Sequence, residues 1–377
     1  MPDLEKVRVS MPQVGPDTAR SVAAALEARW LGMGPLVKEF EERIAAFLGA
    51  PDRKVVCTNT GTAAIHLALL TAGVGPGDEV ITPSFNFVAD HQAIRMTGAD
   101  VVLCDIREED LGIDVEKAEA LVTERTKAIL PLHFAGIPCD QKGVYRLAER
   151  RGLRVVEDAC HGFGSSVDGR RIGAYGDIAC FSFDPVKVVT CVDGGCVVVN
   201  TSDELERLRH LRLLGIDRDT LARYQHTRAW EYDVVDQGFR YHLTDVAASV
   251  GLSQIDQVES FIASRQEVCR RYSAAFAELE GPRVLRRSFD DVSPYIYALR
   301  VPGGRRGALA EHLKARSVET GVHFVAAHTF GFFKGSRRDD MAVTDRVAQE
   351  ILTLPLHSHM REDFVERVID GVRSFFA

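Results

Sequence analysis

Short apolar segments alternate with helix-forming segments over the first two-thirds of the 377-residue chain, and this alternation constrains the fold most. The predicted strands cover residues 79–82, 101–104, 128–132 and 153–156. The helical stretches that separate them lie near 86–97, 114–123 and 140–151. Because these strands are apolar on both faces, they need helices on both sides, as in a parallel sheet. The pattern predicts an α/β fold with a mostly parallel sheet covered by helices.

Helix boundaries and a change of pattern suggest how the chain divides into domains. Pro35 opens an amphipathic helix that Gly49 ends, and Thr244 can cap a long helix running through Ile255 toward Phe276. A strand and two helices are expected after it, at 295–301, 305–316 and 361–376. We therefore expect a large domain over residues 1–243 and a smaller C-terminal α/β domain over residues 244–377.

The composition argues against several functional classes. The formal net charge is -8 and no Lys/Arg-rich run stands out, which argues against a nucleic-acid-binding protein. The N-terminus shows no apolar signal segment, and no apolar run approaches the roughly 18 residues of a membrane span. The eight cysteines form no CxxC pair and no zinc spacing, so we expect reduced thiols, no metal site and a cytoplasmic protein.

Lys187 is the first candidate for covalent chemistry. It ends the segment 181–187 and precedes the glycine pair Gly194–Gly195, and a strand upstream delivers Asp158. A buried carboxylate needs a positive partner, and a protonated pyridine nitrogen would be one. A lysine near a glycine turn, with such an aspartate, suggests a Schiff-base lysine for pyridoxal phosphate. Taken alone, Lys187 also fits a solvated loop, and Asp158 also fits a cap of the following turn.

Two other segments could line a cofactor site. The strand-to-helix turn Thr58–Ala63 offers helix N-terminal N–H groups and hydroxyls to an anion, and Ser182 could add another hydroxyl. The segment Pro83–Ala89 places Phe87 where its face could stack on a flat ring. Taken alone, the turn also fits a plain helix cap, and Phe87 also fits the core.

The order of these motifs resembles the DegT/DnrJ/EryC1/StrS family, the sugar aminotransferases among the fold-type I enzymes that use pyridoxal phosphate (PLP). The resemblance covers nearly the whole chain. The matching segments are 32–41, 59–64, 83–89, 157–161, 181–187, 193–195, 238–248 and 251–252. The resemblance implies a fold-type I architecture and a homodimer whose active sites lie at the subunit interface.

The resemblance also implies roles for individual residues. By position, Lys187 would form the Schiff base and Asp158 would pair with the pyridine nitrogen. His161 would lie near the ring hydroxyl, and Phe87 would stack on the ring. The implied phosphate contacts are Gly61, Thr62 and Ser182.

Three segments depart from the family pattern. Arg240 stands where the family often has asparagine, in a segment that would serve the neighbouring subunit's cofactor. Asp193 stands where glutamate is more common. The segment that holds His323 and His328, the implied substrate contacts, lacks the proline of the family's His-Tyr-x-Pro-x-His pattern. These departures bear on the substrate more than on the cofactor.

The implied activity is transfer of an amino group from an amino acid, with L-glutamate expected, to a keto group of a nucleotide-linked deoxysugar. A keto-cyclitol acceptor, as in aminoglycoside-type pathways, shares every motif and stays open. A PLP-dependent sugar dehydratase is a further alternative, but such relatives typically carry histidine in place of Lys187. A non-catalytic regulator is the last alternative, and the retained Lys187 and Asp158 argue against it.

Overall fold

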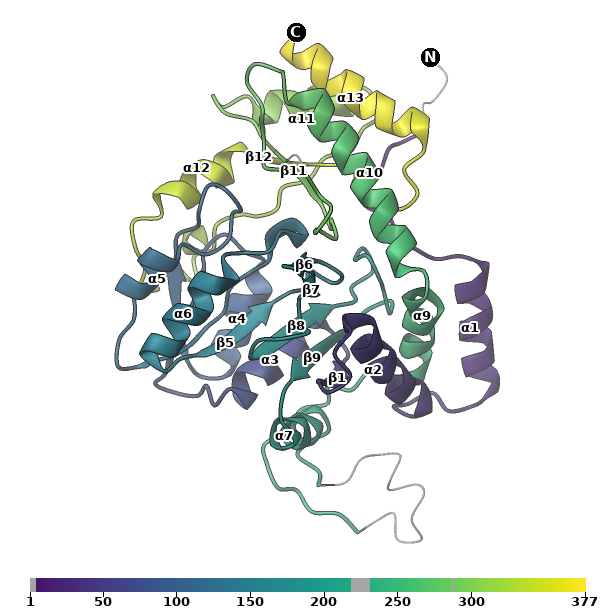
Figure 1. Ribbon diagram of the computed structural model, residues 1–377, viewed down its shortest axis with the longest axis vertical. Helices are drawn as coiled ribbons and strands as arrows, with labels where there is room; N and C mark the ends of the chain where they lie inside the picture. Colours follow the sequence, from purple (N-terminus) through teal and green to yellow (C-terminus); the bar gives the residue numbers. More distant parts are fainter. Residues whose placement is uncertain (1–4, 218–230, 287) are drawn as a thin grey trace.

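A seven-stranded sheet lies at the centre of the protein, which is described by a computed structural model over residues 5–217, 231–286 and 288–377 (Figure 1). The strand order is β1-β9-β8-β5-β4-β2-β3. The strands are β1 (Lys54–Thr58), β2 (Glu79–Pro83), β3 (Asp100–Cys104), β4 (Thr126–Ile129), β5 (Arg154–Asp158), β8 (Ile178–Ser182) and β9 (Gly195–Val199). Neighbouring strands are parallel except for β9, which runs antiparallel to both β1 and β8. The prediction of a mostly parallel sheet is confirmed.

Helices cover both faces of this sheet, as its apolar strands require. The helices of this unit are α1 (Pro16–Glu27), α2 (Pro35–Leu48), α3 (Gly61–Thr71), α4 (Val88–Met96), α5 (Val115–Ala120), α6 (Gln141–Arg151), α7 (Ser202–Arg212) and α9 (Asp245–Ile255). Side chains of one strand alternate between the faces: Val197 belongs to the core cluster with α3, α4 and α7, whereas Val198 belongs to the core cluster with α2 and α9. Helices α5 and α6 extend the second layer over β3, β4 and β5. A small hairpin consists of β6 (Ser166–Val167) and β7 (Arg170–Arg171).

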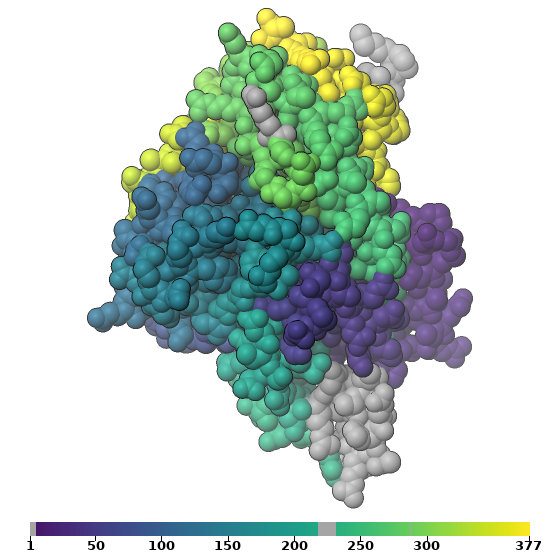
Figure 2. All heavy atoms as spheres, viewed as in Figure 1, coloured from purple at the N-terminus to yellow at the C-terminus, as the bar shows by residue number. Residues whose placement is uncertain are grey.

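The C-terminal part of the chain forms a smaller α/β unit with its own core. A three-stranded antiparallel sheet carries helices on it, and Tyr272, Leu299 and Val368 belong to the core between them. Its elements are α10 (Val258–Phe276), β10 (Arg283–Val284), β11 (Tyr297–Arg300), α11 (Arg306–Lys314), α12 (Ala342–Glu350), β12 (Ile351–Leu354) and α13 (Glu362–Phe376). Figure 2 shows this part, green to yellow, at one end of the molecule beyond the blue and teal large unit.

Some predicted boundaries are confirmed and others need correction. Pro35 opens α2, and Gly49 ends it in the left-handed conformation at φ 69°. Thr244 caps α9, but the single helix predicted from Thr244 toward Phe276 is two helices, because the chain turns at Asp256–Gln257. Helix α9 packs on α1 and α2 of the large unit, and α10 then crosses to the C-terminal core. The division at residues 243 and 244 stays a prediction.

Four strands bring the predicted motifs to one edge of the large sheet. Strands β1, β2, β5 and β8 run in the same direction, and their last residues are Thr58, Pro83, Asp158 and Ser182. Ligands of open α/β sheets bind outside the carboxyl ends of the strands. The fold therefore brings the predicted motifs together at this edge of the sheet.

Candidate active site

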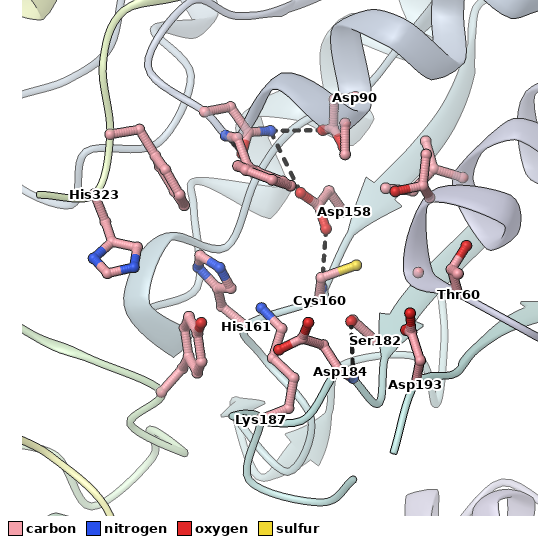
Figure 3. Close-up of a pocket in the computed structure, with 18 residues that line it drawn as sticks. Thr60, Asp90, Asp158, Cys160, His161, Ser182, Asp184, Lys187, Asp193 and His323 are labelled. Atoms are coloured by element: carbon pink, nitrogen blue, oxygen red, sulfur yellow. Dashed lines mark hydrogen bonds between the residues drawn. The ribbon is translucent and has the colours of Figure 1, made fainter. Parts of the chain in front are cut away.

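A cavity of ≈ 280 Å³ opens at this edge of the sheet, between the two units (Figure 3). It is lined by all the predicted site residues except Arg240 and His328. The predicted residues that it brings together are Gly61, Thr62, Phe87, Asp158, His161, Ser182, Lys187 and His323. The C-terminal unit contributes His323 together with Tyr295 and Phe324.

The N-terminus of α3 forms one end of the cavity. Thr60 caps this helix, since its side chain accepts a hydrogen bond from the Ala63 N–H at 2.9 Å. Gly61 opens the helix so close to β8 that a Cβ on it would lie 2.8 Å from Cβ of Ser182. A Cβ on Gly195, in the predicted glycine pair, would likewise lie 2.6 Å from the Thr60 carbonyl oxygen. Glycine is required at both positions, and the result is a narrow cradle of helix N–H groups and hydroxyls that suits an anion.

Lys187 lies half-buried in the loop after β8 and extends into the cavity (Figure 3). Its backbone N–H donates to the Asp184 carbonyl at 3.1 Å, which holds the loop in a turn. Its Nζ lies 3.8 Å from the centroid of the Tyr295 ring. Among the described residues no carboxylate lies within ion-pair distance of this amine. The amine is therefore available for bonding to a ligand in the cavity.

Asp158 has the capping role that its sequence position allowed, and it is buried at the cavity. Its Oδ1 accepts from the Cys160 N–H at 2.9 Å and so caps the following turn. Its Oδ2 accepts from Nδ2 of Asn86 at 3.4 Å. The residue is only 4% exposed, and no cationic side chain of the described residues forms an ion pair with it. A buried carboxylate in this position calls for a positive partner supplied from the cavity.

The opposite wall is built from uncharged rings. The Ala135 N–H donates to Nδ1 of His161 at 3.3 Å, which leaves the ring proton on Nε2. Burial, reinforced by Lys187 and His323, keeps the pKa of His161 well below its ordinary value. Burial also lowers the pKa of His323 to about 4. Both imidazoles are therefore neutral hydrogen-bonding groups at physiological pH.

Two predicted residues lie elsewhere. His328 uses both ring nitrogens within the chain, with Ser84 Oγ at 2.8 Å and Asp345 Oδ1 at 2.9 Å. Arg240 is exposed, and its backbone pairs with Leu213 rather than lining the cavity of its own chain. The structure does not bring either side chain to the site.

Asn86, Asp90, Tyr295 and Phe324 line the cavity but were not among the predicted site residues. Asn86 lies within the motif that drew attention to Phe87, and Asp90 follows it, but a helix-capping role explains an aspartate there equally well. Tyr295 and Phe324 carry no local signal, since only the packing of the C-terminal unit brings them to the sheet edge.

A cluster of three carboxyl groups lies outside the cavity. Carboxylate oxygens of Asp105, Asp339 and Asp340 lie close together in the described part of the chain. The ammonium of Lys117 lies 2.7 Å from Asp105 and 2.6 Å from Asp340, so it already supplies the positive charge there.

Among the described helices, none is long and apolar enough to cross a membrane.

Comparison with known proteins identifies the family of the chain. The model of the DegT/DnrJ/EryC1/StrS aminotransferase family matches residues 12–373. The chain belongs to this family. It is 35% identical to the spore coat polysaccharide biosynthesis protein SpsC of Bacillus subtilis over 97% of this chain and 95% of that protein.

Solved structures of family relatives have the same fold. The sugar aminotransferase CalS13 from Micromonospora echinospora has a TM-score of 0.89 at 28% identity, covering 98% of this chain and 99% of that one. A Streptococcus pneumoniae protein solved in its PLP form has a TM-score of 0.88 at 28% identity, covering 98% of each chain. The protein is a PLP-dependent aminotransferase of fold type I. The sequence-based expectations for family, fold, enzyme class and cofactor are confirmed.

The cavity fits this cofactor. The cradle at Gly61 and Ser182 suits a phosphate, and the buried carboxylate of Asp158 suits a protonated ring nitrogen. Lys187 offers an amine without an ionic partner among the described residues. Phe87 lines the cavity with 57% of its surface exposed, so an apolar face is free to cover a flat ring.

Proposed function

We propose that this aminotransferase moves an amino group from L-glutamate to a keto group of a nucleotide-linked deoxysugar. The observation that carries the proposal is the placement of the Lys187 amine and the Asp158 carboxylate in one cavity, each without an ionic partner among the described residues. The names of two relatives, a sugar aminotransferase and a polysaccharide biosynthesis protein, support a sugar acceptor. The neutral imidazoles of His161 and His323 support it too, because they suit hydroxyl groups.

The cofactor would be held at four points. The N-terminus of α3, with Gly61 and Thr62, and the hydroxyl of Ser182 would bind the phosphate. Asp158 would hold the protonated ring nitrogen, and Nε2–H of His161 would donate to the ring hydroxyl. Phe87 would cover one face of the ring.

PLP supplies an aldehyde carbon for covalent attachment and a ring that accepts electron density from the substrate carbon. Lys187 Nζ would hold the cofactor through this carbon. When its amine is free, Nζ would act as the base that takes the proton from the substrate α carbon. Tyr295, over the amine, would limit the directions in which Nζ moves.

The active enzyme would be a homodimer with shared active sites. Arg240 is exposed and lies away from the cavity of its own chain, which supports a contact with the neighbouring subunit's cofactor. His323 lines the cavity on the C-terminal side and would contact the sugar. His328 is bound to Ser84 and Asp345, so its role would be to hold the wall near His323 rather than to touch the substrate.

A keto-cyclitol acceptor remains the alternative, because the same neutral wall suits any ring that bears hydroxyl groups. The dehydratase and the non-catalytic regulator are not proposed, since the chain belongs to an aminotransferase family.

A substrate panel tests the proposal. Purified enzyme with PLP would receive glutamate and either nucleotide-linked keto-sugars or keto-cyclitols, with formation of 2-oxoglutarate as the measurement. We expect turnover with a nucleotide-linked keto-sugar and none with the Lys187→Ala variant. Turnover with keto-cyclitols alone would transfer the assignment to the alternative, and activity only with another amino donor would remove glutamate from it.

A further inference from the structure

Asp90 lies in the first turn of α4 and lines the same cavity as Asp158. Asp90 is 1% exposed and Asp158 is 4% exposed. A single amide group joins them, since Nδ2 of Asn86 donates to Asp90 Oδ2 at 2.6 Å and to Asp158 Oδ2 at 3.4 Å (dashed lines in Figure 3). The two carboxyl groups therefore lie together in one buried corner of the cavity.

The orientation of the Asn86 amide is set by the backbone. Its Oδ1 accepts from the Phe87 N–H at 2.6 Å, so the NH₂ group must face the two carboxyl groups. Because Phe87 is also the residue before α4, the same hydrogen bond places the start of that helix. Asn86 thus sets the positions of Asp90 and Asp158 relative to each other.

Two negative charges cannot persist together in this corner. No cationic side chain of the described residues forms an ion pair with either carboxyl group, and one amide cannot balance two buried charges. The titratable groups around this corner are Cys160, Cys180 and His91, together with Lys187 in the same cavity. The two thiols and the neutral imidazole of His91 carry no positive charge, and the Lys187 amine forms no ion pair with either carboxyl group. Burial, followed by the charge of Asp158, raises the pKa of Asp90 well above its usual range.

We propose that Asp90 is a positioning residue that stays protonated, donates its hydroxyl to Asp158, and so keeps Asp158 ionised and aimed at the ring nitrogen of the cofactor. The inference rests on the proposed role of Asp158 toward that nitrogen. The hydrogen bond would stabilise the carboxylate form of Asp158, so the pair would carry one negative charge and one proton at neutral pH. Asp90 would act on the cofactor only through Asp158.

Infrared spectroscopy of the apoenzyme tests the proton directly. At neutral pH we expect the carbonyl stretch of a protonated carboxylic acid, lost in Asp90→Asn and kept in Asp17→Asn. Asp17 is a matched control because it also lies in the first turn of a helix but is exposed. A spectrum that is identical in the wild type and Asp90→Asn would overturn the proposal.

The pH dependence of apoenzyme stability gives a second measurement without the cofactor. A carboxyl group whose pKa is raised in the folded state binds more protons there than in the unfolded chain. The free energy of unfolding therefore falls as the pH rises from about 4, the ordinary aspartate pKa. Asp90→Asn should flatten this fall, and Asp17→Asn should leave it unchanged. An unchanged slope in Asp90→Asn would contradict a proton on Asp90.

Equilibrium binding of PLP to the apoenzyme tests the positioning. Asp90→Asn keeps a donor toward Asp158, so we expect its Kd for PLP to stay within about threefold of the wild type. Asp90→Ala removes the donor and should raise the Kd about tenfold. An unchanged Kd in a folded Asp90→Ala protein would overturn the positioning role.

Asp158→Asn, measured in parallel, separates this inference from the proposed function. If Asp158→Asn kept the wild-type activity and PLP affinity, the proposed role of Asp158 would fail while the infrared result still reported on Asp90. If Asp158→Asn lost activity but both Asp90 variants behaved as the wild type, only the inference about Asp90 would fail.

Discussion

The Nζ atom of Lys187 lies 3.8 Å from the centroid of the Tyr295 ring, so the C-terminal unit covers the amine of the large unit. The electron-rich face of a tyrosine attracts a cation, and this contact places the amine on the cavity side of the loop. Tyr295 also lies 4.3 Å, centroid to centroid, from the His161 ring. Tyr295 thus contacts both the Lys187 amine and the His161 ring and fixes their relative positions.

Replacing Tyr295 should separate the effect of the ring from that of its hydroxyl. A cation–π contact is worth about 0.5–2 kcal/mol, which corresponds to roughly 2- to 30-fold in rate. Tyr295→Phe keeps the aromatic face and should retain the wild-type rate of the glutamate half-reaction within about threefold. Tyr295→Leu should slow that half-reaction by roughly 2- to 30-fold. Single-turnover measurement of cofactor conversion by glutamate checks this, and a slower Tyr295→Phe than Tyr295→Leu would contradict it.

Removal of the Lys187 amine should abolish turnover without unfolding the protein. Proton transfer by a positioned group contributes about 10²–10⁴-fold, so Lys187→Ala should lose at least that much in kcat. Borohydride treatment of the wild type, followed by peptide mapping, should find the reduced cofactor on Lys187. Lys142 is a suitable control because its amine is exposed and pairs with Asp168. Recovery of the label on Lys142 or another lysine would refute the assignment of Lys187.

A methyl group on Gly61 should weaken the binding of the cofactor phosphate. The new Cβ would lie 2.8 Å from Cβ and 2.9 Å from Oγ of Ser182, so α3 and β8 would have to separate. Overpacking of this kind costs about 1–3 kcal/mol, and we expect Gly61→Ala to raise the Kd for PLP by about tenfold or more. Gly307→Ala is the control, since Gly307 lies in α11 with no atom near its Cβ position. Equal PLP affinity in the two variants would show that the close approach of α3 is unimportant.

Acid should weaken the attachment of α12 to the large unit at Asp105. Although burial opposes the charge, Lys117 and the N–H groups of Val343 and Thr344 lower the pKa of Asp105 from 3.8 to about 2. Because the folded pKa is the lower one, the stabilisation is present above about pH 4 and is lost as the pH falls toward 2. The ionised Asp105 therefore contributes about 2 kcal/mol to the free energy of unfolding at neutral pH.

Asp105→Asn should remove this stabilisation. In urea unfolding at a series of pH values, the free energy of unfolding of Asp105→Asn should be about 2 kcal/mol below that of the wild type at pH 7. This difference should shrink as the pH falls below 4. A difference in the free energy of unfolding that stays constant with pH would mean that the ionisation of Asp105 does not contribute to stability.

The sequence by itself determined the fold class, the family and most of the predicted residues that line the cavity. Apolar strands need cover on both faces, which specifies a parallel α/β sheet, and residues that end such strands meet at one edge whatever the details of packing. Asp158, Ser182 and the Thr58–Ala63 turn were therefore predictable from their positions alone. Pro35 and Gly49 likewise set the ends of α2, because backbone geometry at those residues is local.

Only the tertiary structure decided which groups complete the site. Tyr295 and Phe324 reach the cavity through the packing of the C-terminal unit, a long-range contact that no local pattern encodes. The same packing directs both ring nitrogens of His328 to Ser84 and Asp345. The charge state of Asp90 depends on burial beside Asp158, and burial is a property of the assembled fold rather than of the residue.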